Sequence, residues 1–232
     1  MARTKPAEHS GLSPIQRSGT IADEVADRII MAIVRGEKQP GERITEAEIA
    51  EAMNVSRVPA REAMQKLRLR GILVLEDVRG MRVADFSEER IAELYEIRLA
   101  IEKIIFRHAL PRCRSHPELV DRLEAIVDRM HAASQAHDVV AIGLLDVEFH
   151  QTVAEISGNE LAARFWDGLS PHLVIIFCRE WSRAPNPPGE VKIHRDLCEL
   201  LRTGSIEDID AMLTNHIINP QSLLNWKWRA PA

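Results

Sequence analysis

Residues 55–63 read Val55-Ser56-Arg57-Val58-Pro59-Ala60-Arg61-Glu62-Ala63, and this stretch decides the fold of the first third of the chain. Ser56 has the side chain of a helix N-cap, and Pro59 is tolerated in the first turn of the helix that follows. The stretch therefore predicts a helix from Ser56 to about Leu69. Gly71 then ends it.

The segment before this helix predicts two more helices. Apolar residues recur at helical spacing at Ile21, Val25, Ile29 and Ile33. Gly36 stops that pattern, and Thr45 is placed to cap a short helix over residues 46–53. The tight connection Asn54-Val55 leads from this short helix directly into the helix that starts at Ser56.

The segment after it predicts a β-hairpin and then helices only. Residues 72–75 and 81–84 are short β-prone runs joined by residues 76–80. The later helices are predicted over residues 88–110, 117–136, 138–156, 160–182, 190–203 and 206–218, with Pro111 as the first break. The fold class is therefore mainly α: three helices with a hairpin wing, followed by an all-helical bundle.

Composition excludes several classes of protein. The chain has 232 residues, of which 45% are hydrophobic and 28% charged, and this is typical of a globular protein. Its longest apolar run, residues 139–145, is far shorter than the roughly 20 residues that span a bilayer. No cationic stretch followed by an apolar segment opens the chain, so no secretory signal is expected. The three cysteines form neither an even set nor a Cys-x-x-Cys pair, which favours a reducing, cytoplasmic location.

Three segments with different properties are predicted. Residues 1–19 are rich in Ser, Pro, Gly and basic residues without periodicity, and we expect a disordered arm. Residues 20–84 form the first domain, and residues 85–232 form the helical domain, which carries a net charge of −7. Within the first domain, residues 57–83 carry a local charge of +4, which fits either the footprint of a polyanion or a solvated helix face.

Two short helices joined by a tight turn and followed by a hairpin are the layout of a winged helix-turn-helix, a DNA-binding module. Its second helix enters the major groove with the N-terminal end first, so the opening residues of that helix contact base edges and phosphates. The candidate DNA contacts at this helix start and at the hairpin tip are Ser56, Arg57, Val58, Arg61, Arg79 and Gly80. For the two helical arginines, the alternative is surface charge paired with Glu51 or Glu62.

Four linked motifs of this domain carry a family resemblance. They are PGERITE at residues 40–46, VSRVPAREA at 55–63, GIL at 71–73 and RGMRV at 79–83. At this spacing they resemble the GntR family of bacterial transcription regulators over residues 20–84. The resemblance implies a homodimer that reads a palindromic operator in double-stranded DNA. It makes Arg57 and Arg61 DNA contacts, Ser56 a phosphate contact and Gly80 the tip of the wing.

Two positions depart from that family's pattern. Val58 stands where the family usually has Thr, and Ala60 where it usually has Val. Val58 cannot donate a hydrogen bond, so a contact from this position is apolar, for example to a thymine methyl group. The departure leaves the module intact and the operator sequence open.

Four polar residues occupy core-facing positions on three predicted helices of the second domain: Asp146, His150, His194 and His216. A single buried histidine is ordinarily satisfied by one hydrogen bond, and this alternative stays open for each of them. Together they are costly, because an unpaired polar group in an apolar interior costs about 1–3 kcal/mol. Asp146 and His150 lie one helical turn apart, so the four side chains fit one divalent cation such as zinc, nickel, manganese or iron.

The segment Asp146-Val147-Glu148-Phe149-His150, with His194 and His216 further along, resembles the metal-binding form of the FadR-type C-terminal (FCD) ligand domain. The resemblance implies that Asp146, His150, His194 and His216 hold the metal, with zinc expected in the purified protein, and that a small organic acid binds beside it as the effector. Four ligands around tetrahedral zinc leave no open position, whereas a six-coordinate metal leaves two. The helical domain is also expected to supply the dimer interface.

Arg98 is the candidate effector-binding residue. It shares a helical face with apolar residues, so we expect it to point inward, where a guanidinium needs an anion. The effector carboxylate and Glu102, one turn further along, are the two candidates. At the other end of the domain, Pro220 lies four residues after His216, so the last helix is expected to kink or end there.

The interpretation is a cytoplasmic, homodimeric transcription regulator whose operator affinity depends on a small carboxylate bound at the metal. One alternative keeps the DNA-binding function and makes the metal purely structural. The other is a metal-dependent enzyme fused to a DNA-binding module. An enzyme needs a general base, and Glu148 lies about 160° around the helix from His150. No catalytic residues are therefore predicted, and no membrane partner.

Overall fold

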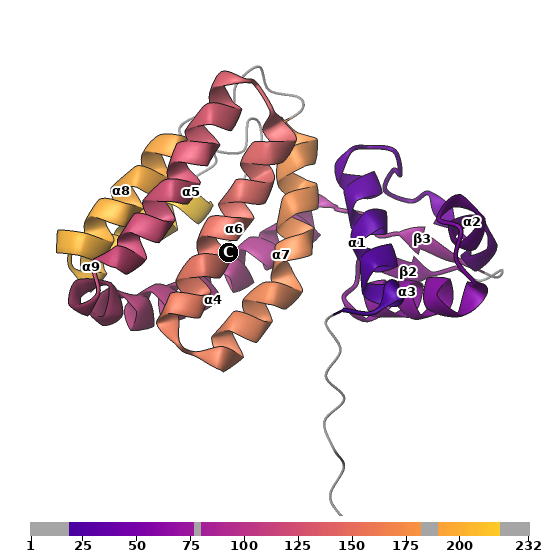
Figure 1. Cartoon of the computed structure of the whole chain (residues 1–232), viewed down its shortest axis with the longest axis horizontal. Helices are drawn as coiled ribbons and strands as arrows, with labels where there is room; N and C mark the ends of the chain where they lie inside the picture. Colours follow the sequence, from indigo (N-terminus) through magenta and orange to yellow (C-terminus); the bar gives the residue numbers. More distant parts are fainter. Residues whose placement is uncertain (1–18, 77–79, 182–189, 219–232) are drawn as a thin grey trace, which may run out of the picture.

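The computed structural model describes residues 19–76, 80–181 and 190–218. They form two parts in Figure 1, a small N-terminal unit on the right and a larger helical unit on the left. The arm predicted before residue 19, Arg79 at the hairpin tip and the tail that contains Pro220 lie outside the described residues. Among the described helices, none is long and apolar enough to cross a membrane.

The N-terminal unit has the predicted winged helix-turn-helix fold. Its helices are α1 (Ile21–Val34), α2 (Glu46–Ala52) and α3 (Arg57–Leu69), and its strands are β1 (Arg43–Ile44), β2 (Leu73–Leu75) and β3 (Met81–Val83). The strands form an antiparallel sheet in the order β1-β3-β2, with Leu73 opposite Val83 and Ile44 opposite Met81. Strand β1 was not predicted, because two residues are too few to show an alternating pattern.

Cap chemistry explains where these helices begin. Thr20 and Asp23 form a reciprocal capping box at the start of α1. The Thr45 hydroxyl accepts a hydrogen bond from the Glu48 N–H at 3.2 Å, which confirms the predicted cap of α2. Ser56 occupies the N-cap position of α3, but its hydroxyl makes no capping hydrogen bond, so the predicted capping role is wrong. The helix itself therefore leaves this hydroxyl unused.

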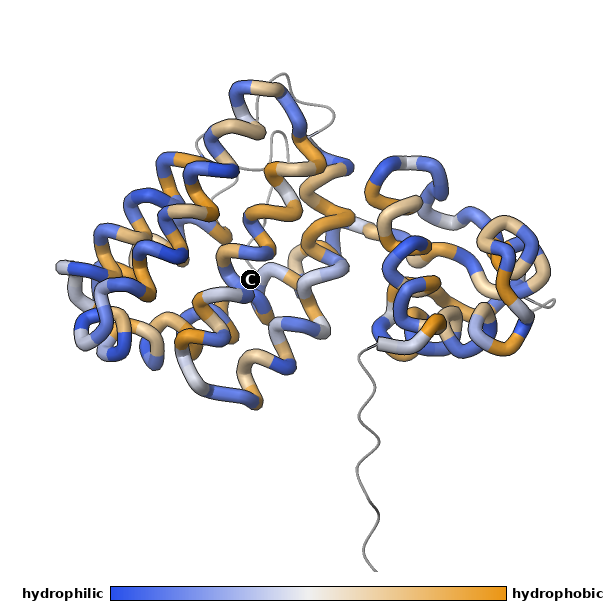
Figure 2. The backbone as a smooth tube through the Cα atoms, viewed as in Figure 1, coloured by the Kyte–Doolittle hydropathy of each residue, from blue (hydrophilic) through white to orange (hydrophobic). Residues whose placement is uncertain are grey.

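The helical unit is built around α6. Its helices are α4 (Glu88–Ser115), α5 (Glu118–Gln135), α6 (Val139–Ser157), α7 (Glu160–Trp181), α8 (Glu190–Thr203) and α9 (Ile206–Ile218). Helix α6 packs against α4, α5 and α7, while α9 packs against α4 and α8. The burial of α6 and α7 explains the long hydrophobic stretches that both show in Figure 2. The three cysteines are free, as the sequence predicts, and all three are buried.

Helix α4 runs through Pro111, where a break was predicted, and continues to Ser115. The proline ring removes one backbone hydrogen bond. Leu110 and Cys113 on either side of it are nevertheless buried against neighbouring helices. Burial of these side chains outweighs the lost bond and keeps the last turn helical.

The two units meet at the C-terminal end of α3. Arg90 on α4 donates a 2.7 Å hydrogen bond to the Gly71 carbonyl, and the Nε2 atom of His172 on α7 lies 2.8 Å from the Arg70 carbonyl. Gly71 has a φ of +75°, and a Cβ added to it would lie 3.1 Å from Arg90 Nη2. Glycine is required here for the backbone conformation and for the approach of Arg90.

Gly71→Ala is expected to destabilise the chain more than Gly36→Ala. Both glycines have positive φ, +75° and +73°, so each substitution costs about 1–2 kcal/mol in the left-handed conformation. At Gly71 the new methyl group also displaces Arg90, and a hydrogen bond to a charged group contributes about 1.5–3 kcal/mol. Urea unfolding of the full chain measures both effects. In an Arg90→Ala background the two alanine variants should become equal, and a difference that persists would contradict this role of Arg90.

Candidate metal centre and DNA-binding surface

The first turn of α3 faces solvent. Arg57, Val58 and Arg61 are exposed, and 53% of the Val58 surface is accessible. Neither arginine forms an ion pair with a described residue, so the pairing considered with neighbouring glutamates is not observed. Two guanidinium groups one turn apart at a helix N-terminus, without an ion-pair partner in the described part of the chain, are suited to phosphates and guanine edges.

The wing lies beside this helix in the same unit. Gly80 has a φ of +137°, and a Cβ there would approach the Arg43 Nε atom at 3.2 Å and the Ile44 carbonyl at 3.4 Å. Glycine at this position therefore lets β3 begin directly beside β1. Arg82 on β3 is exposed, whereas Arg79 lies outside the described residues.

The four predicted metal ligands converge inside the helical unit. Asp146 and His150 come from α6, His194 from α8 and His216 from α9, and none is more than 6% exposed. One ligand atom of each residue lies within 4.8 Å of the others. Ligands on opposite sides of a metal ion, each about 2.0–2.2 Å from it, lie about 4.0–4.4 Å apart. Opposite ligands of a six-coordinate ion therefore need shifts of a few tenths of an ångström, whereas the ligands of a tetrahedral ion lie about 3.3–3.6 Å apart and need shifts of about 1 Å.

The contacts of the imidazoles show which ring nitrogen carries the proton and which one has the lone pair. His194 Nδ1 lies 2.7 Å from the Glu190 carbonyl and carries the proton, so Nε2 turns its lone pair toward Asp146 Oδ1 at 3.2 Å. His150 Nδ1 lies 2.9 Å from Glu102 Oε2, which leaves Nε2 as a second lone pair. An acceptor that faces a carboxylate requires a proton or a cation between them. His150 and His194 are each oriented from behind by an oxygen, as metal-ligating histidines are.

The pKa values of His194 and Asp146 also indicate that a positive charge is favoured between the two side chains. Burial by itself lowers the pKa of His194, but the Asp146 carboxylate raises it above the ordinary value. Burial likewise raises the pKa of Asp146, but the Arg98 guanidinium and then His194 hold it well below the usual range. The pair therefore attracts positive charge, as a proton or as a metal ion.

Negative charge exceeds positive charge around the four ligands. Glu102, Asp146 and Glu190 are buried beside the buried Arg98. The surplus reaches two negative charges when all three carboxylates are ionised and the imidazoles are neutral, and the raised pKa values of Glu190 and His194 show that protons on these groups reduce it. A divalent cation compensates this surplus, and uncompensated buried charge is strongly unfavourable.

Glu190 was not predicted to belong to this cluster. It opens α8, and an acidic residue at a helix start is ordinarily explained by the helix dipole alone. Here it is 2% exposed, and neither of its carboxylate oxygens has a hydrogen-bond partner among the described residues. Burial, followed by the nearby Asp146 carboxylate, raises the pKa of Glu190 above its usual range. The signal available in the sequence was its position one turn before His194.

Arg98 is buried, as its helical face predicts, and its closest anion is Glu102. Arg98 Nε donates to Glu102 Oε1 at 2.6 Å, and Nη2 lies 3.2 Å from His150 Nε2 and 3.6 Å from Asp146 Oδ2. The guanidinium also lies 5.9 Å from the Trp166 ring centre. Of the two anions considered for Arg98, the structure thus brings Glu102 to it.

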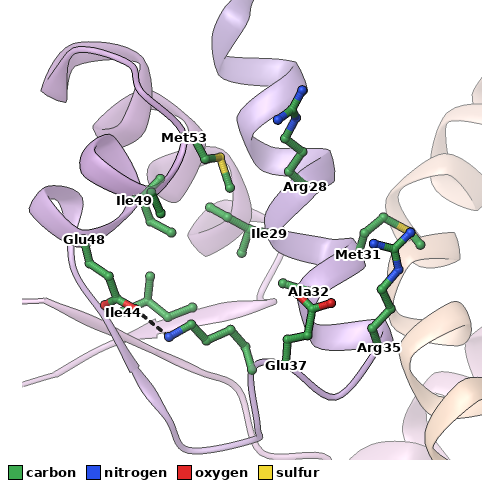
Figure 3. Close-up of a pocket in the computed structure, with 12 residues that line it drawn as sticks. Arg28, Ile29, Met31, Ala32, Arg35, Glu37, Ile44, Glu48, Ile49 and Met53 are labelled. Atoms are coloured by element: carbon green, nitrogen blue, oxygen red, sulfur yellow. Dashed lines mark hydrogen bonds and ion pairs between the residues drawn. The ribbon is translucent and has the colours of Figure 1, made fainter.

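Two hollows accompany these features. A cavity of about 10 Å³, room for about one water molecule, lies beside Arg98, Asp146, Glu190 and His216. A larger one of about 530 Å³ lies in the N-terminal unit between α1 and α2, and Figure 3 shows the Lys38–Glu48 contact at its edge. None of the predicted DNA contacts or metal ligands lines the larger hollow.

A winged helix-turn-helix followed by a helical bundle with a buried polar site defines a DNA-binding transcription regulator. Two family models match this division of the chain. "Bacterial regulatory proteins, gntR family" matches residues 21–83, and "FCD domain" matches residues 93–219. The chain belongs to the GntR family and carries an FCD domain, which confirms both families that the sequence motifs resemble.

Proteins similar in sequence to this chain are named as transcriptional repressors. The chain is 28% identical over 198 residues to the probable D-xylose utilization operon transcriptional repressor of Paenarthrobacter nicotinovorans, covering 85% of this chain and 86% of that protein. It is 33% identical over 147 residues to the gluconate operon transcriptional repressor of Bacillus subtilis (strain 168), covering 63% and 59%.

Solved structures confirm the fold. The E. coli McbR/YncC structure matches with a TM-score of 0.76 at 17% identity, covering 89% of this chain and 98% of that chain. A putative GntR transcriptional regulator from Rhodococcus sp. RHA1 matches with a TM-score of 0.73 at 22% identity, covering 89% and 99%. At these identities the likeness concerns the fold alone.

Glu102→Gln is expected to weaken Zn²⁺ binding about 10–100-fold, the usual effect of losing a carboxylate behind a metal-ligating histidine. The substitution keeps the volume of the side chain and removes the charge that faces His150 Nδ1. Competition with a chromophoric chelator measures the dissociation constant. Glu148→Gln is the matched control, since Glu148 lies on α6 but is partly exposed and pairs with Arg129 at 2.6 Å. Equal Zn²⁺ affinity in Glu102→Gln and the wild type would contradict the orienting role.

Proposed function

We propose that the chain is a metal-dependent sensor of a small organic acid, which regulates its binding to operator DNA in the cytoplasm. The observation that carries the proposal is the buried set Asp146, His150, His194 and His216 with Arg98 beside it. These residues offer three imidazoles and a carboxylate to a divalent metal and a guanidinium to an anion. When bound, the metal supplies open coordination positions for a carboxylate.

Arg98 is suited to respond to the metal. Its Nη2 atom lies 3.2 Å from His150 Nε2, the nitrogen assigned to the metal. A metal ion that takes the lone pair of this nitrogen releases the guanidinium N–H from it. The released N–H borders the cavity and is available to an acid. Glu102 remains bonded to Arg98 Nε and keeps the side chain in place.

The small size of the cavity means that binding of an organic acid requires a change of conformation. The cavity beside the ligands holds about one water molecule, so an organic acid fits only when the surrounding helices separate. An acid that binds the separated state alone shifts the population toward it. This separation of the helices is then transmitted to the DNA-binding unit.

A purely structural metal is the second candidate, and the small cavity favours it. Four protein ligands around tetrahedral zinc need no further space. The enzyme alternative has no comparable support, because Glu148 pairs with Arg129 and is not turned toward the metal ligands.

A homodimer is part of the proposal. The helices α4 and α7 pack against each other and carry large exposed apolar side chains: Ile97 and Ile104 on α4, and Leu161 and Phe165 on α7, each 45–65% exposed. Exposed apolar surface of this kind is typical of an interface. A twofold dimer places two recognition helices on the two halves of a palindromic operator.

A thermal-shift screen of small carboxylates, on Zn²⁺-loaded and chelator-stripped protein in parallel, tests the sensor. An acid at about 100 times its dissociation constant adds about 2.7 kcal/mol to stability and raises the melting temperature measurably. We expect at least one acid to stabilise only the metal-loaded form. If chelation lowers the melting temperature and no acid shifts it, the structural role of the metal is supported and the sensor is rejected.

Arg57→Ala is expected to weaken operator binding by about one to two orders of magnitude, because a bidentate base contact contributes about 1–3 kcal/mol. Fluorescence anisotropy with a duplex selected by the wild-type protein measures it at several salt concentrations. Loss of a phosphate contact alone would instead lower the salt slope by about one unit. Arg28→Ala is the control, since this exposed arginine of α1 pairs with Glu24. Unchanged affinity in Arg57→Ala, at unchanged dimer mass, would reject the assigned contact.

A further inference from the structure

We propose that Arg90 and His172 are positioning residues for DNA recognition. They reach from the helical unit to the C-terminal end of α3 and tie the orientation of this recognition helix to the state of the metal centre. The inference rests on the proposed function, in which the metal centre controls operator affinity. Neither residue needs to contact DNA or metal, because both act through α3.

The end of α3 offers acceptors that the helix does not satisfy itself. The last carbonyls of a helix lack intrahelical donors and carry partial negative charge. Here the Gly71 carbonyl accepts from Arg90 of α4 at 2.7 Å, and the Arg70 carbonyl faces His172 Nε2 of α7 at 2.8 Å. Asp167 of α7 adds an ion pair to the Arg70 side chain at 3.8 Å. The helical unit therefore supplies the hydrogen-bond donors that the C-terminal end of the recognition helix lacks.

The junction is packed as one cluster. His172 is 5% exposed, and its other nitrogen, Nδ1, has no hydrogen-bond partner among the described residues. Burial lowers the pKa of His172, so the ring is neutral and its single N–H is on the nitrogen that faces Arg70. Phe86 packs edge-on against this ring, with 6.2 Å between centroids, and Arg90 lies 5.9 Å from the Phe86 ring centre.

Helix α7 connects this junction to the metal centre. His172 lies on α7 between two aromatic residues that contact the buried cluster. The Trp166 ring lies 5.4 Å from the His150 ring, and the Phe177 ring centre lies 5.2 Å from the Arg98 guanidinium. A displacement of His150 or Arg98 therefore acts on the same helix that holds Arg70.

Helix α4 provides a second connection. Arg90 and Arg98 lie eight residues apart on α4, about 12 Å along its axis. A metal ion at His150 Nε2 removes the 3.2 Å contact of Arg98 Nη2, and α4 carries the change toward Gly71. Helix α1, which packs against both α3 and α7, turns Met31 and Arg35 toward the helical unit in Figure 3.

A small displacement of the C-terminal end of α3 also moves its N-terminal end, which carries predicted DNA contacts. Helix α3 has 13 residues and is about 20 Å long, so tilting its C-terminal end moves Arg57 and Arg61 at the other end. In a dimer the same tilt changes the spacing of two recognition helices. Coupling free energies between such sites ordinarily change affinity about 5- to 150-fold.

The test compares operator affinity in Zn²⁺-loaded and chelator-stripped protein, with Zn²⁺ alone as the ligand and a duplex selected from a random library by the wild-type chain. His172→Leu keeps bulk and removes the N–H, whereas His172→Gln restores an N–H donor. Arg90→Ala removes the second tie. Arg164→Ala is the matched control, because this arginine is exposed on the same helix.

We expect removal of Zn²⁺ to change the dissociation constant of the wild type for the duplex about 5- to 150-fold. In His172→Leu and Arg90→Ala this ratio should fall toward one, with metal stoichiometry unchanged. The ratio should return in His172→Gln and stay at the wild-type value in Arg164→Ala. A merely structural role of His172 would lower affinity equally with and without Zn²⁺.

A wild-type ratio retained in His172→Leu and Arg90→Ala overturns the inference and leaves the proposed function standing. A ratio of one in the wild type, despite bound Zn²⁺, also overturns the inference, whereas the proposed function is rejected only when no acid stabilises the metal-loaded form. Hydrogen exchange of the wild-type chain provides a measurement that needs no variant to fold. Zn²⁺ should change the exchange rate of the Gly71 and Ile72 amides, which bond to the Arg68 and Leu67 carbonyls at 2.9 Å. Unchanged exchange at both amides also overturns the inference.

Discussion

The ion pair between Arg98 and Glu102 is the interaction on which the helical unit depends. Its atoms lie 2.6 Å apart, and both side chains are at most 2% exposed. Removing two such ions from water costs several kcal/mol each, and one contact does not compensate for that cost. Asp146 and His150 supply the remaining contacts, and His194 and His216 gather around Asp146. Residues of α4, α6, α8 and α9 each contribute to this cluster. A movement of any of these helices therefore changes the distances between its charged groups.

Local patterns in the sequence predicted the elements that depend on neighbours in the chain. Thr45 as a cap and the helix that follows Ser56 come from residues within one or two turns of each other. The candidate metal ligands were predicted because a polar residue on an apolar helical face is conspicuous, and Asp146 and His150 lie one turn apart. Arg98 was identified by the same argument.

The features that were missed depend on tertiary contacts. Burial on both sides carries α4 through Pro111, and no pattern in the sequence indicates that burial. Glu190 has an ordinary role at the start of a helix, and only the approach of α6 and α9 turns it into part of the charged cluster. The ties from Arg90 and His172 to α3 join residues from different domains. Ser56 shows the opposite error, because its position was correct but its hydroxyl serves no cap.

The small cavity beside Asp146 and His216 has a kinetic consequence. A ligand that enters a space sized for one water molecule waits for the surrounding helices to open, so its association is slower than diffusion allows. Release waits for the same opening. In the proposed sensor, the response therefore follows the average level of the acid over the lifetime of the complex and filters out brief fluctuations, so the tight packing around Arg98 would set a response time as well as a fold.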